Sequence, residues 1–406
     1  MFDTGSTGFM LIATSLVMLM TPGLAFFYGG LVGRKSVLTI MIQSFVSLGW
    51  TTILWFAFGY SLCFSGGQGG IIGNFDLAFL AGTSLNSVFT GNNHIPLYVF
   101  VAYQMMFAII TPALITGAFT NRVKFPAYMI FLTAWLILVY FPLVHMVWGG
   151  GLLAEWGVLD FAGGIVVHAS AGMAALASVF YVGKRNIIER GPHSIPLVAL
   201  GTGLLWFGWY GFNAGSELQV DSITAAAFLN TDVAASFAAI VWLFLAWVLE
   251  KKPKFVGLLT GAVAGLATIT PAAGFVTVQQ AAIIGIAAGI VCYFAVSLKN
   301  KLHWDDALDV WGVHGVGGSL GVIMLGLFAT SAVNPMVTTN GLFVGGGFDF
   351  FWKQLITVVA VCAYAFVFTY VMLWIINFIT PVKVTKLEEE TGLDNSLHGE
   401  LAYEQE

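Results

Sequence analysis

One stretch of the chain, Asp160-Phe-Ala-Gly-Gly-Ile-Val-Val-His168-Ala-Ser-Ala-Gly172, has a counterpart later in the sequence. In that second frame Asp306 precedes His314 by eight residues, Val313 precedes the histidine directly, and Gly318 follows it by four residues. Both histidines lie inside apolar segments, where an ionisable side chain is costly and marks a pathway or a site. The duplication predicts one site that is built from two related halves.

The composition is that of an all-α, polytopic membrane protein. Hydrophobic residues make up 58% of the 406 residues and charged residues only 9%, whereas about 25% of an average soluble domain is charged. The net charge of −5 is summed over two faces in different compartments, and it gives no case for nucleic acid. About 20 apolar residues of helix cross a bilayer. Eleven transmembrane helices are therefore predicted, at residues 8–32, 36–62, 95–119, 125–148, 160–183, 195–213, 222–249, 255–271, 277–298, 306–329 and 351–380.

The basic residues predict the orientation of these helices. Lys and Arg in short loops stay on the cytoplasmic side. The loops after the even-numbered helices contain neither residue, and Lys353 at the start of the eleventh helix is the exception. The N-terminus is therefore expected outside and the C-terminus inside. The basic residues follow the odd-numbered helices, and they are Arg34, Lys35, Arg122, Lys124, Lys184, Arg185, Arg190, Lys251, Lys252, Lys254, Lys299, Lys301, Lys383 and Lys386.

The two histidine frames divide the chain into halves of opposite orientation. Aligning them pairs the fifth helix with the tenth, and an offset of five spans reverses the direction through the membrane, as in the inverted repeats of many transporters. One membrane domain at 1–380 is expected, with repeat halves at about 8–183 and 195–329 and a peripheral eleventh helix at about 351–380. Residues 381–406 form a charged tail with a composition typical of disorder.

The paired histidines allow two interpretations. Each could serve as a hydrogen-bonding link between helices. Alternatively, two facing neutral imidazoles could bond each other and a small polar solute, and could pass a proton. Zinc would need three or four ligands, and neither frame contains Cys or Glu, so no metal or other cofactor is predicted. Glycines in the helices favour close packing, and those beside the histidines are expected to keep a lumen clear.

Five further residues are candidates for function. Trp148 ends the fourth helix, where it fits either the aromatic belt of the membrane interface or a cation site on the indole face. Ser216 follows the sixth helix on the same outer side and could accept an N–H. Phe107 and Phe212 are typical packing aromatics when each is considered alone. Asp232 lies ten residues into the seventh helix, where a charge should face a partner, a subunit interface or water, or be protonated; it stays unassigned.

Several long motifs, spread over essentially the whole chain, together resemble the ammonium transporter (Amt/Mep/Rh) family. Retention of Trp148 and Ser216 favours the Amt branch over the Rhesus branch, whose outer site lacks this arrangement. Tyr103 stands where many relatives have Phe, so the vestibule is expected to differ slightly. The motifs are the Asp160–Gly172 stretch with Gly183-Lys184-Arg185, Pro22-Gly-Leu-Ala-Phe-Phe-Tyr28-Gly-Gly-Leu, His145-Met-Val-Trp148-Gly-Gly-Gly-Leu, Gly211-Phe-Asn-Ala-Gly-Ser216, Asp309-Val-Trp-Gly-Val-His314-Gly and Gly392-Leu-Asp-Asn-Ser-Leu-His-Gly-Glu-Leu-Ala-Tyr403.

The resemblance implies a role for each candidate except Asp232. Trp148, Phe107 and Ser216 look like the outer recruitment site of the family, and Phe107 with Phe212 resembles its stacked gate. His168 and His314 resemble the twin histidines of its narrow pore. Asp160 resembles the carboxylate that organises the outer site from within the structure. The family is also similar in forming homotrimers with one pore per subunit.

The function that the resemblance implies is transport of ammonium or ammonia across the cell membrane, here a prokaryotic cytoplasmic membrane. We hypothesise that ammonium is recruited at the outer site and deprotonated near the gate, and that ammonia is conducted while the proton travels along a separate path; methylammonium is the expected analogue. The alternative is a sensor of the same fold that binds ammonium and transports little. No signalling module lies within these 406 residues, which favours transport. The tail resembles an ordered regulatory segment that takes part in inhibition by PII signal proteins. No arrangement of residues indicates an enzyme.

Overall fold

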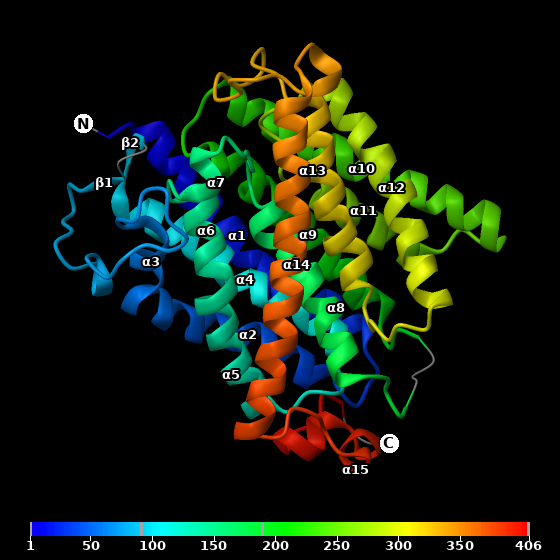
Figure 1. Ribbon diagram of the computed structural model, residues 1–406. Helices are drawn as coiled ribbons and strands as arrows, with labels where there is room; N and C mark the ends of the chain where they lie inside the picture. The colour runs from blue at the N-terminus through cyan, green and yellow to red at the C-terminus, as the bar shows by residue number, and fades with distance from the viewer. Residues whose placement is uncertain (1, 90–91, 188–190, 404–406) are drawn as a thin grey trace.

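The computed structural model describes residues 2–89, 92–187 and 191–403. Arg190 and the last three residues of the tail lie outside these described residues. The described chain is mainly helical, and its two termini lie at opposite ends of the helical bundle (Figure 1), as an odd number of membrane crossings requires. The predicted fold class is confirmed.

Eleven apolar helical segments run through the described part of the chain, one at each predicted position. Ten are long and apolar enough to cross a membrane, and α11 is shorter, with 15 residues. The segments are α1 (Thr4–Leu31), α2–η1–α3 (Val37–Leu54, Trp55–Gly59, Tyr60–Phe64), α4 (Leu97–Phe119), α5–η3–α6 (Phe125–Trp135, Leu136–Tyr140, Phe141–Trp148), η4–α8 (Gly164–Ala169, Ser170–Val182), α9 (Ile195–Ala214), α10 (Ser222–Glu250), α11 (Phe255–Ile269), α12 (Val278–Lys301), η6–α13 (Trp311–Val316, Gly317–Phe328) and α14 (Phe348–Ile379).

Shorter elements lie in the connections. A small hairpin pairs β1 and β2 antiparallel, with Val88 opposite Pro96 and Phe89 opposite Asn92. The tail contains α15 and η8 at the end of the molecule where the C-terminus lies (Figure 1). The bounds are η2 (Ala78–Leu80), β1 (Val88–Phe89), β2 (Asn92–Pro96), α7 (Leu152–Glu155), η5 (Gly215–Glu217), η7 (Leu342–Val344), α15 (Lys386–Thr391) and η8 (Asp394–His398).

Two carboxylates set the start of the fifth and tenth helices. Asp160 accepts hydrogen bonds from the backbone N–H groups of residues 163–166 at 2.7–3.2 Å. Asp306 accepts in the same way from Val310 at 3.1 Å and Trp311 at 2.8 Å. Each carboxylate thus satisfies N–H groups that have no partner inside the helix. The predicted starts at 160 and 306 are therefore wrong, because helix begins only at Gly164 and Trp311.

Glycines bring the two halves of the repeat into backbone contact. A Cβ atom on Gly172 would lie 2.0 Å from the backbone nitrogen of Gly315, and one on Gly318 would lie 2.6 Å from the Cβ of His168. Gly172 therefore packs on the segment of His314, and Gly318 packs on the segment of His168. These glycines permit close contact between backbones. Because the glycine of each half packs on the histidine segment of the other half, the contacts follow the predicted pseudo-symmetry.

Ion pairs join the loops at the end of the bundle where the C-terminus lies. The guanidinium of Arg122 donates to the carbonyl oxygen of Gly183 at 2.6 Å and to that of Asp305 at 2.7 Å. The Asp305 carboxylate pairs with Arg185 at 2.7 Å and with Arg122 at 3.5 Å. Burial alone would raise the pKa of Asp305, but the hydrogen bonds from Arg185 and the charge of Arg122 lower it below its usual value. The loops after the third, fifth and ninth helices are thereby tied together.

The tail is ordered against the same end, although its composition is typical of disorder. The Asp394 carboxylate accepts the backbone N–H groups of Leu38 at 3.0 Å and Thr39 at 2.8 Å, so it caps the start of α2. Glu388 pairs with Lys124 at 3.2 Å. Local composition missed this order because the partners of the tail lie on distant loops.

Candidate functional site

The two predicted histidines lie edge to edge in the centre of the bundle. Their Nδ1 atoms are 3.2 Å apart, their ring centroids are 5.2 Å apart, and the ring planes differ by only 17°. A neutral imidazole has one N–H and one acceptor nitrogen, so one ring donates from Nδ1 and the other accepts. The Nε2 atom of His168 is buried and has no partner among the described residues. It can therefore bond a small solute.

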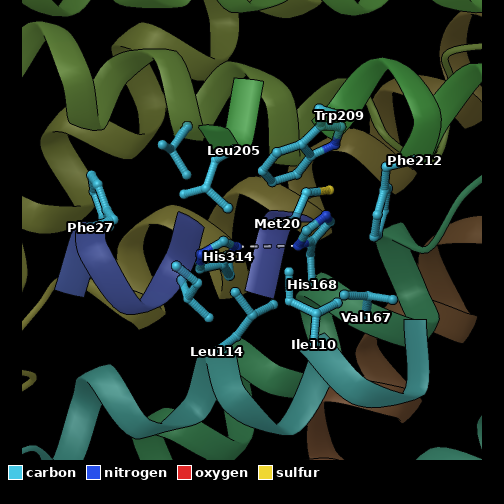
Figure 2. Close-up of a pocket in the computed structure, with 12 residues that line it drawn as sticks. Met20, Phe27, Ile110, Leu114, Val167, His168, Leu205, Trp209, Phe212 and His314 are labelled. Carbon is cyan, nitrogen blue, oxygen red and sulfur yellow. Dashed lines mark hydrogen bonds between the residues drawn. The ribbon is translucent and has the colours of Figure 1, made fainter. Parts of the chain in front are cut away.

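Apolar side chains surround the histidine pair. Figure 2 shows Trp209 and Phe212 beside His168, and Phe27 on the far side of His314. The cavity here measures about 10 Å³, close to the smallest space that admits one water-sized molecule. A bare cation would lose its hydration shell in such a lining without compensation. The lining residues besides the histidines are Met20, Leu24, Phe27, Ile110, Leu114, Val167, Leu205, Trp209, Phe212 and Val263.

Wide π-helical turns hold both histidines. His168 lies in η4, where its backbone N–H donates to the carbonyl oxygen of Gly163 at 2.9 Å. Gly163 has a backbone φ of +119°, which residues that carry a side chain rarely adopt. A Cβ atom there would also collide with the side chain of Val167. His314 lies in the corresponding turn, η6. Such turns occur frequently at functional sites.

Two stacked phenylalanines lie next to His168. The rings of Phe107 on α4 and Phe212 on α9 have centroids 4.1 Å apart and planes 27° apart. Both side chains are buried, and the Phe212 ring lies 6.0 Å from that of His168. Aromatic residues predicted in separate helices are thus brought together in line with the histidine pair.

Trp148 lies on the other side of Phe107. Its ring meets Phe107 edge to face, with centroids 6.0 Å apart. Its indole Nε1 donates to the backbone carbonyl of Asp160 at 2.8 Å. The Asp160 carboxylate points instead into the backbone of η4. Asp160 therefore links the indole to the histidine turn without lining the passage.

Ser216 and Tyr103 complete this outer group. The Ser216 hydroxyl donates to the carbonyl of Phe212 at 2.9 Å, which leaves its oxygen lone pairs as acceptors. The Tyr103 hydroxyl lies 3.2 Å from that of Ser216, and 2.9 and 2.8 Å from the carbonyl oxygens of Gly211 and Phe212. The hydroxyl of Tyr103 thus adds polar contacts that a phenylalanine at this position would lack.

The remaining candidate, Asp232, lies apart from this line. Its Oδ1 accepts from the indole of Trp206 at 3.1 Å and from the hydroxyl of Tyr210 at 2.7 Å. Trp209 was missed by sequence reasoning, although its ring stacks on His168 with centroids 5.4 Å apart. Its position three residues before Phe212, on the same helical face, is the signal that could have found it. In residues 2–89, 92–187 and 191–403, no three His, Cys, Asp or Glu side chains form a group that could hold a metal.

The chain is similar to known proteins over nearly its whole length. The model of the Ammonium Transporter Family matches residues 8–403. An ammonium transporter of Bacillus subtilis is 45% identical over 402 residues, which cover 98% of this chain and 98% of that protein. The crystal structure of Candida albicans Mep2 superposes with a TM-score of 0.87 at 36% identity, over 95% of this chain and 88% of that chain.

A solved structure named "Sensor Amt Protein" also superposes with a TM-score of 0.87, at 28% identity, over 96% of this chain and 97% of that chain. The Bacillus relative is named as a transporter and not as an enzyme. Sequence and fold agree over nearly the whole length. This multi-pass membrane protein therefore belongs to the ammonium transporter family, in its Amt branch.

Proposed function

We propose that the protein transports ammonium by capturing it at the outer aromatic group, removing a proton, and conducting ammonia past the two histidines. The observation that carries this proposal is the unbroken line from Trp148 through the Phe107–Phe212 stack to His168 and His314. Each member offers a different chemistry to a solute that moves inward.

Capture would use the aromatic faces and the hydroxyl of Ser216. A cation within about 6 Å of an indole face gains about 0.5–2 kcal/mol. Ammonium also carries N–H groups, and the Ser216 oxygen can accept one of them. This site alone would favour cations in general, because potassium has nearly the same charge and radius as ammonium.

Selection would come from the apolar lumen beyond the stack. Ammonium can lose a proton and continue as neutral ammonia, whereas potassium keeps its charge and meets the full desolvation penalty. The free nitrogen of His168 can bond the ammonia as it passes. The two histidines therefore decide which solute continues, and they need not bind the cation.

The released proton would follow the imidazole pair. The Nδ1 atoms, 3.2 Å apart, form one proton-sharing link between the rings. Ammonia and the proton would both reach the inside, so transport would carry net positive charge. Uptake of labelled methylammonium into proteoliposomes, with the transmembrane current recorded in ammonium, tests this. Uptake above empty liposomes together with current is expected; uptake without current would refute the separate proton path.

A sensor function is the second candidate, because the fold matches "Sensor Amt Protein" closely. The same proteoliposomes distinguish a sensor from a transporter. Saturable binding of methylammonium without uptake would identify a sensor, whereas uptake many times the number of protein molecules identifies a transporter.

We further propose a homotrimer in a prokaryotic cytoplasmic membrane, with residues 381–406 as a regulatory tail under residues 1–380. Many apolar side chains on α10, α12 and α14 are exposed on the single chain, as lipid or neighbouring subunits would require. The tail contacts the loops at residues 34–39, 124, 186–187 and 193, so a cytoplasmic PII signal protein could act on the pore through it.

A further inference from the structure

His145 lies on α6, one helical turn before Trp148, and the proposed pathway does not use it. Its side chain is fully buried. Its Nδ1 is 2.9 Å from the backbone carbonyl oxygen of Cys63, and its Nε2 is 2.9 Å from that of Gly67. Both ring nitrogens therefore face hydrogen-bond acceptors that carry no hydrogen.

A neutral imidazole cannot satisfy this geometry. It has only one N–H, so its second nitrogen would direct a lone pair at a carbonyl oxygen. The imidazolium has two N–H groups and can donate to both carbonyls, in bonds that its charge strengthens. We propose that His145 is held as an imidazolium that clamps residues 66–73, here called the outer glycine loop, to α6 and so positions Trp148.

Three glycines make room for this clamp. A Cβ on Gly149 would lie 2.8 Å from Nδ1 of His145, and one on Gly67 would lie 2.9 Å from its Nε2. A Cβ on Gly151 would lie 2.8 Å from the backbone oxygen of His145. Gly67 also has φ +69°, a conformation that other residues rarely adopt. The backbone is thus fitted closely around the ring on both sides.

The clamped loop is joined to the turn that follows Trp148. Gly69 N–H donates to the carbonyl of Gly150 at 3.3 Å, and Leu152 N–H donates to the carbonyl of Gly70 at 2.9 Å. The N–H groups of Gly149 and Gly151 both return to the carbonyl of His145 at 3.0 Å. Loop, turn and histidine therefore form one unit, and release of the imidazole would free the chain on both sides of Trp148.

The charged groups around His145 are compatible with a positive charge on its ring. The carboxylate of Glu155 on α7 lies against Gly69, with an oxygen 2.7 Å from where a Cβ would stand, so an opposite charge borders the outer glycine loop. The other titratable groups on the packed elements are Tyr60 and Cys63 on α3, Tyr140 on η3, His168 on η4 and Asp76 after the loop. Among these elements no Lys or Arg opposes a positive charge on His145.

The first test reads the protonation state directly. Protein with ¹⁵N-labelled histidine and ¹³C-carbonyl cysteine is studied by solid-state NMR at pH 7. Because the chain has only three cysteines, a contact between an imidazole N–H and a cysteine carbonyl identifies His145 without any variant. Two protonated nitrogens on that ring are expected. One protonated and one bare nitrogen at pH 7 would overturn the proposal.

The second test follows the loop. Hydrogen exchange of residues 66–73 is compared between wild-type protein and His145→Gln. Loss of one charged bond should raise exchange about tenfold, and His303→Gln, at an exposed histidine, should leave it unchanged. Equal exchange of residues 66–73 in wild-type protein and His145→Gln would contradict the clamp.

The expected effect of His145→Gln on transport rests on the proposed function, whereas the NMR and hydrogen-exchange tests do not depend on it. His145→Gln should raise the half-saturation concentration for methylammonium about tenfold with little change in maximal uptake, because the capture site is displaced and the lumen is intact. If wild-type protein shows no uptake, the proposed transport fails while the NMR result still stands. If maximal uptake alone falls, His145 does not position the capture site.

Discussion

The indole of Trp148 is held by two different contacts: its N–H donates to the Asp160 carbonyl, and its ring packs perpendicular to that of Phe107. Because the N–H is already bonded, an aromatic face is the feature that a cation would use. Trp148→Leu should therefore raise the half-saturation concentration for methylammonium about 2- to 30-fold, from the loss of about 0.5–2 kcal/mol. Uptake into proteoliposomes measures this. Trp156→Leu, at an exposed tryptophan on the same side, is the control and should change little.

Substitution of either pore histidine by a carboxylate is expected to change ion selectivity. A carboxylate in the lumen would offset the desolvation of a bare cation, so His168→Asp or His314→Glu should admit potassium. A gain of about 1.4 kcal/mol in cation stabilisation would raise potassium flux about tenfold. Potassium uptake by proteoliposomes measures it, with His303→Asp at an exposed position as the control. Continued exclusion of potassium by both pore variants would refute the role assigned to the pair.

Asp305 predicts a dependence of stability on pH. Its pKa is lowered in the folded protein, so its contribution is present above the unfolded pKa of about 3.9 and is lost as the pH falls through the folded value. Asp305→Asn should lower stability by about 1–3 kcal/mol at pH 7, because Arg122 and Arg185 lose a charged acceptor. Thermal unfolding in detergent should show this difference at pH 7 and a smaller one below about pH 4. An equal difference at both pH values would contradict the ion-pair explanation.

Single residues also show what the sequence could predict about the site. The type and spacing of residues identified His168 and His314, and family resemblance joined them to Trp148, Phe107, Phe212 and Ser216. The partners of Asp232 were not predictable, because the depth of a charge in a helix does not reveal which neighbouring side chains face it. Trp206 and Tyr210 supply them from the preceding helix.

At the scale of elements, the contact between the fifth and tenth helices leaves no space for a side chain. Gly172→Ala would place a carbon 2.0 Å from the backbone of Gly315. The helices would have to separate, at a cost of about 1–3 kcal/mol or more, and the histidine pair would be displaced. Lower thermal stability and loss of uptake are expected. Gly203→Ala, with nothing within 4 Å of its Cβ position, is the matched control.

The tail is attached to α2 by one carboxylate. Asp394→Ala removes the bonds to Leu38 and Thr39, and the loss of a helix cap costs about 0.5–2 kcal/mol. Faster cleavage after residue 380 in limited proteolysis is expected. Glu400→Ala, at an exposed carboxylate, should leave the cleavage rate unchanged. Equal rates for both variants would show that Asp394 does not hold the tail.

The helices themselves were largely predictable, because a run of about 20 apolar residues has few alternatives to a membrane helix. Two starts were not. Hydropathy includes residues 160 to 163 with the fifth helix, but the Asp160 carboxylate takes the N–H groups there and holds the chain in another conformation. The order of the tail was also beyond composition, since its partners lie on distant loops, those of Asp394 more than 350 residues earlier.

For the whole molecule, hydropathy predicted the number of crossings and charge predicted their direction, and the inverted repeat followed from the odd offset between the two histidine frames. The lining of the lumen could be recognised only in the folded chain. Its apolar lining comes from residues such as Met20, Leu114 and Val263 on three separate helices. Nothing distinguishes these residues from others of their kind until the helices are assembled.

The backbone contact between Gly172 and Gly315 has a mechanical consequence. Many transporters with inverted repeats work by rocking one half against the other around a central site. Here the two halves touch through bare backbone beside that site and are bridged by the bond between His168 and His314. If the halves rocked, this backbone contact and the bond between the histidines would have to break in every transport cycle. Conduction should therefore proceed through a stationary passage, with only side chains moving, as in a channel and not a pump.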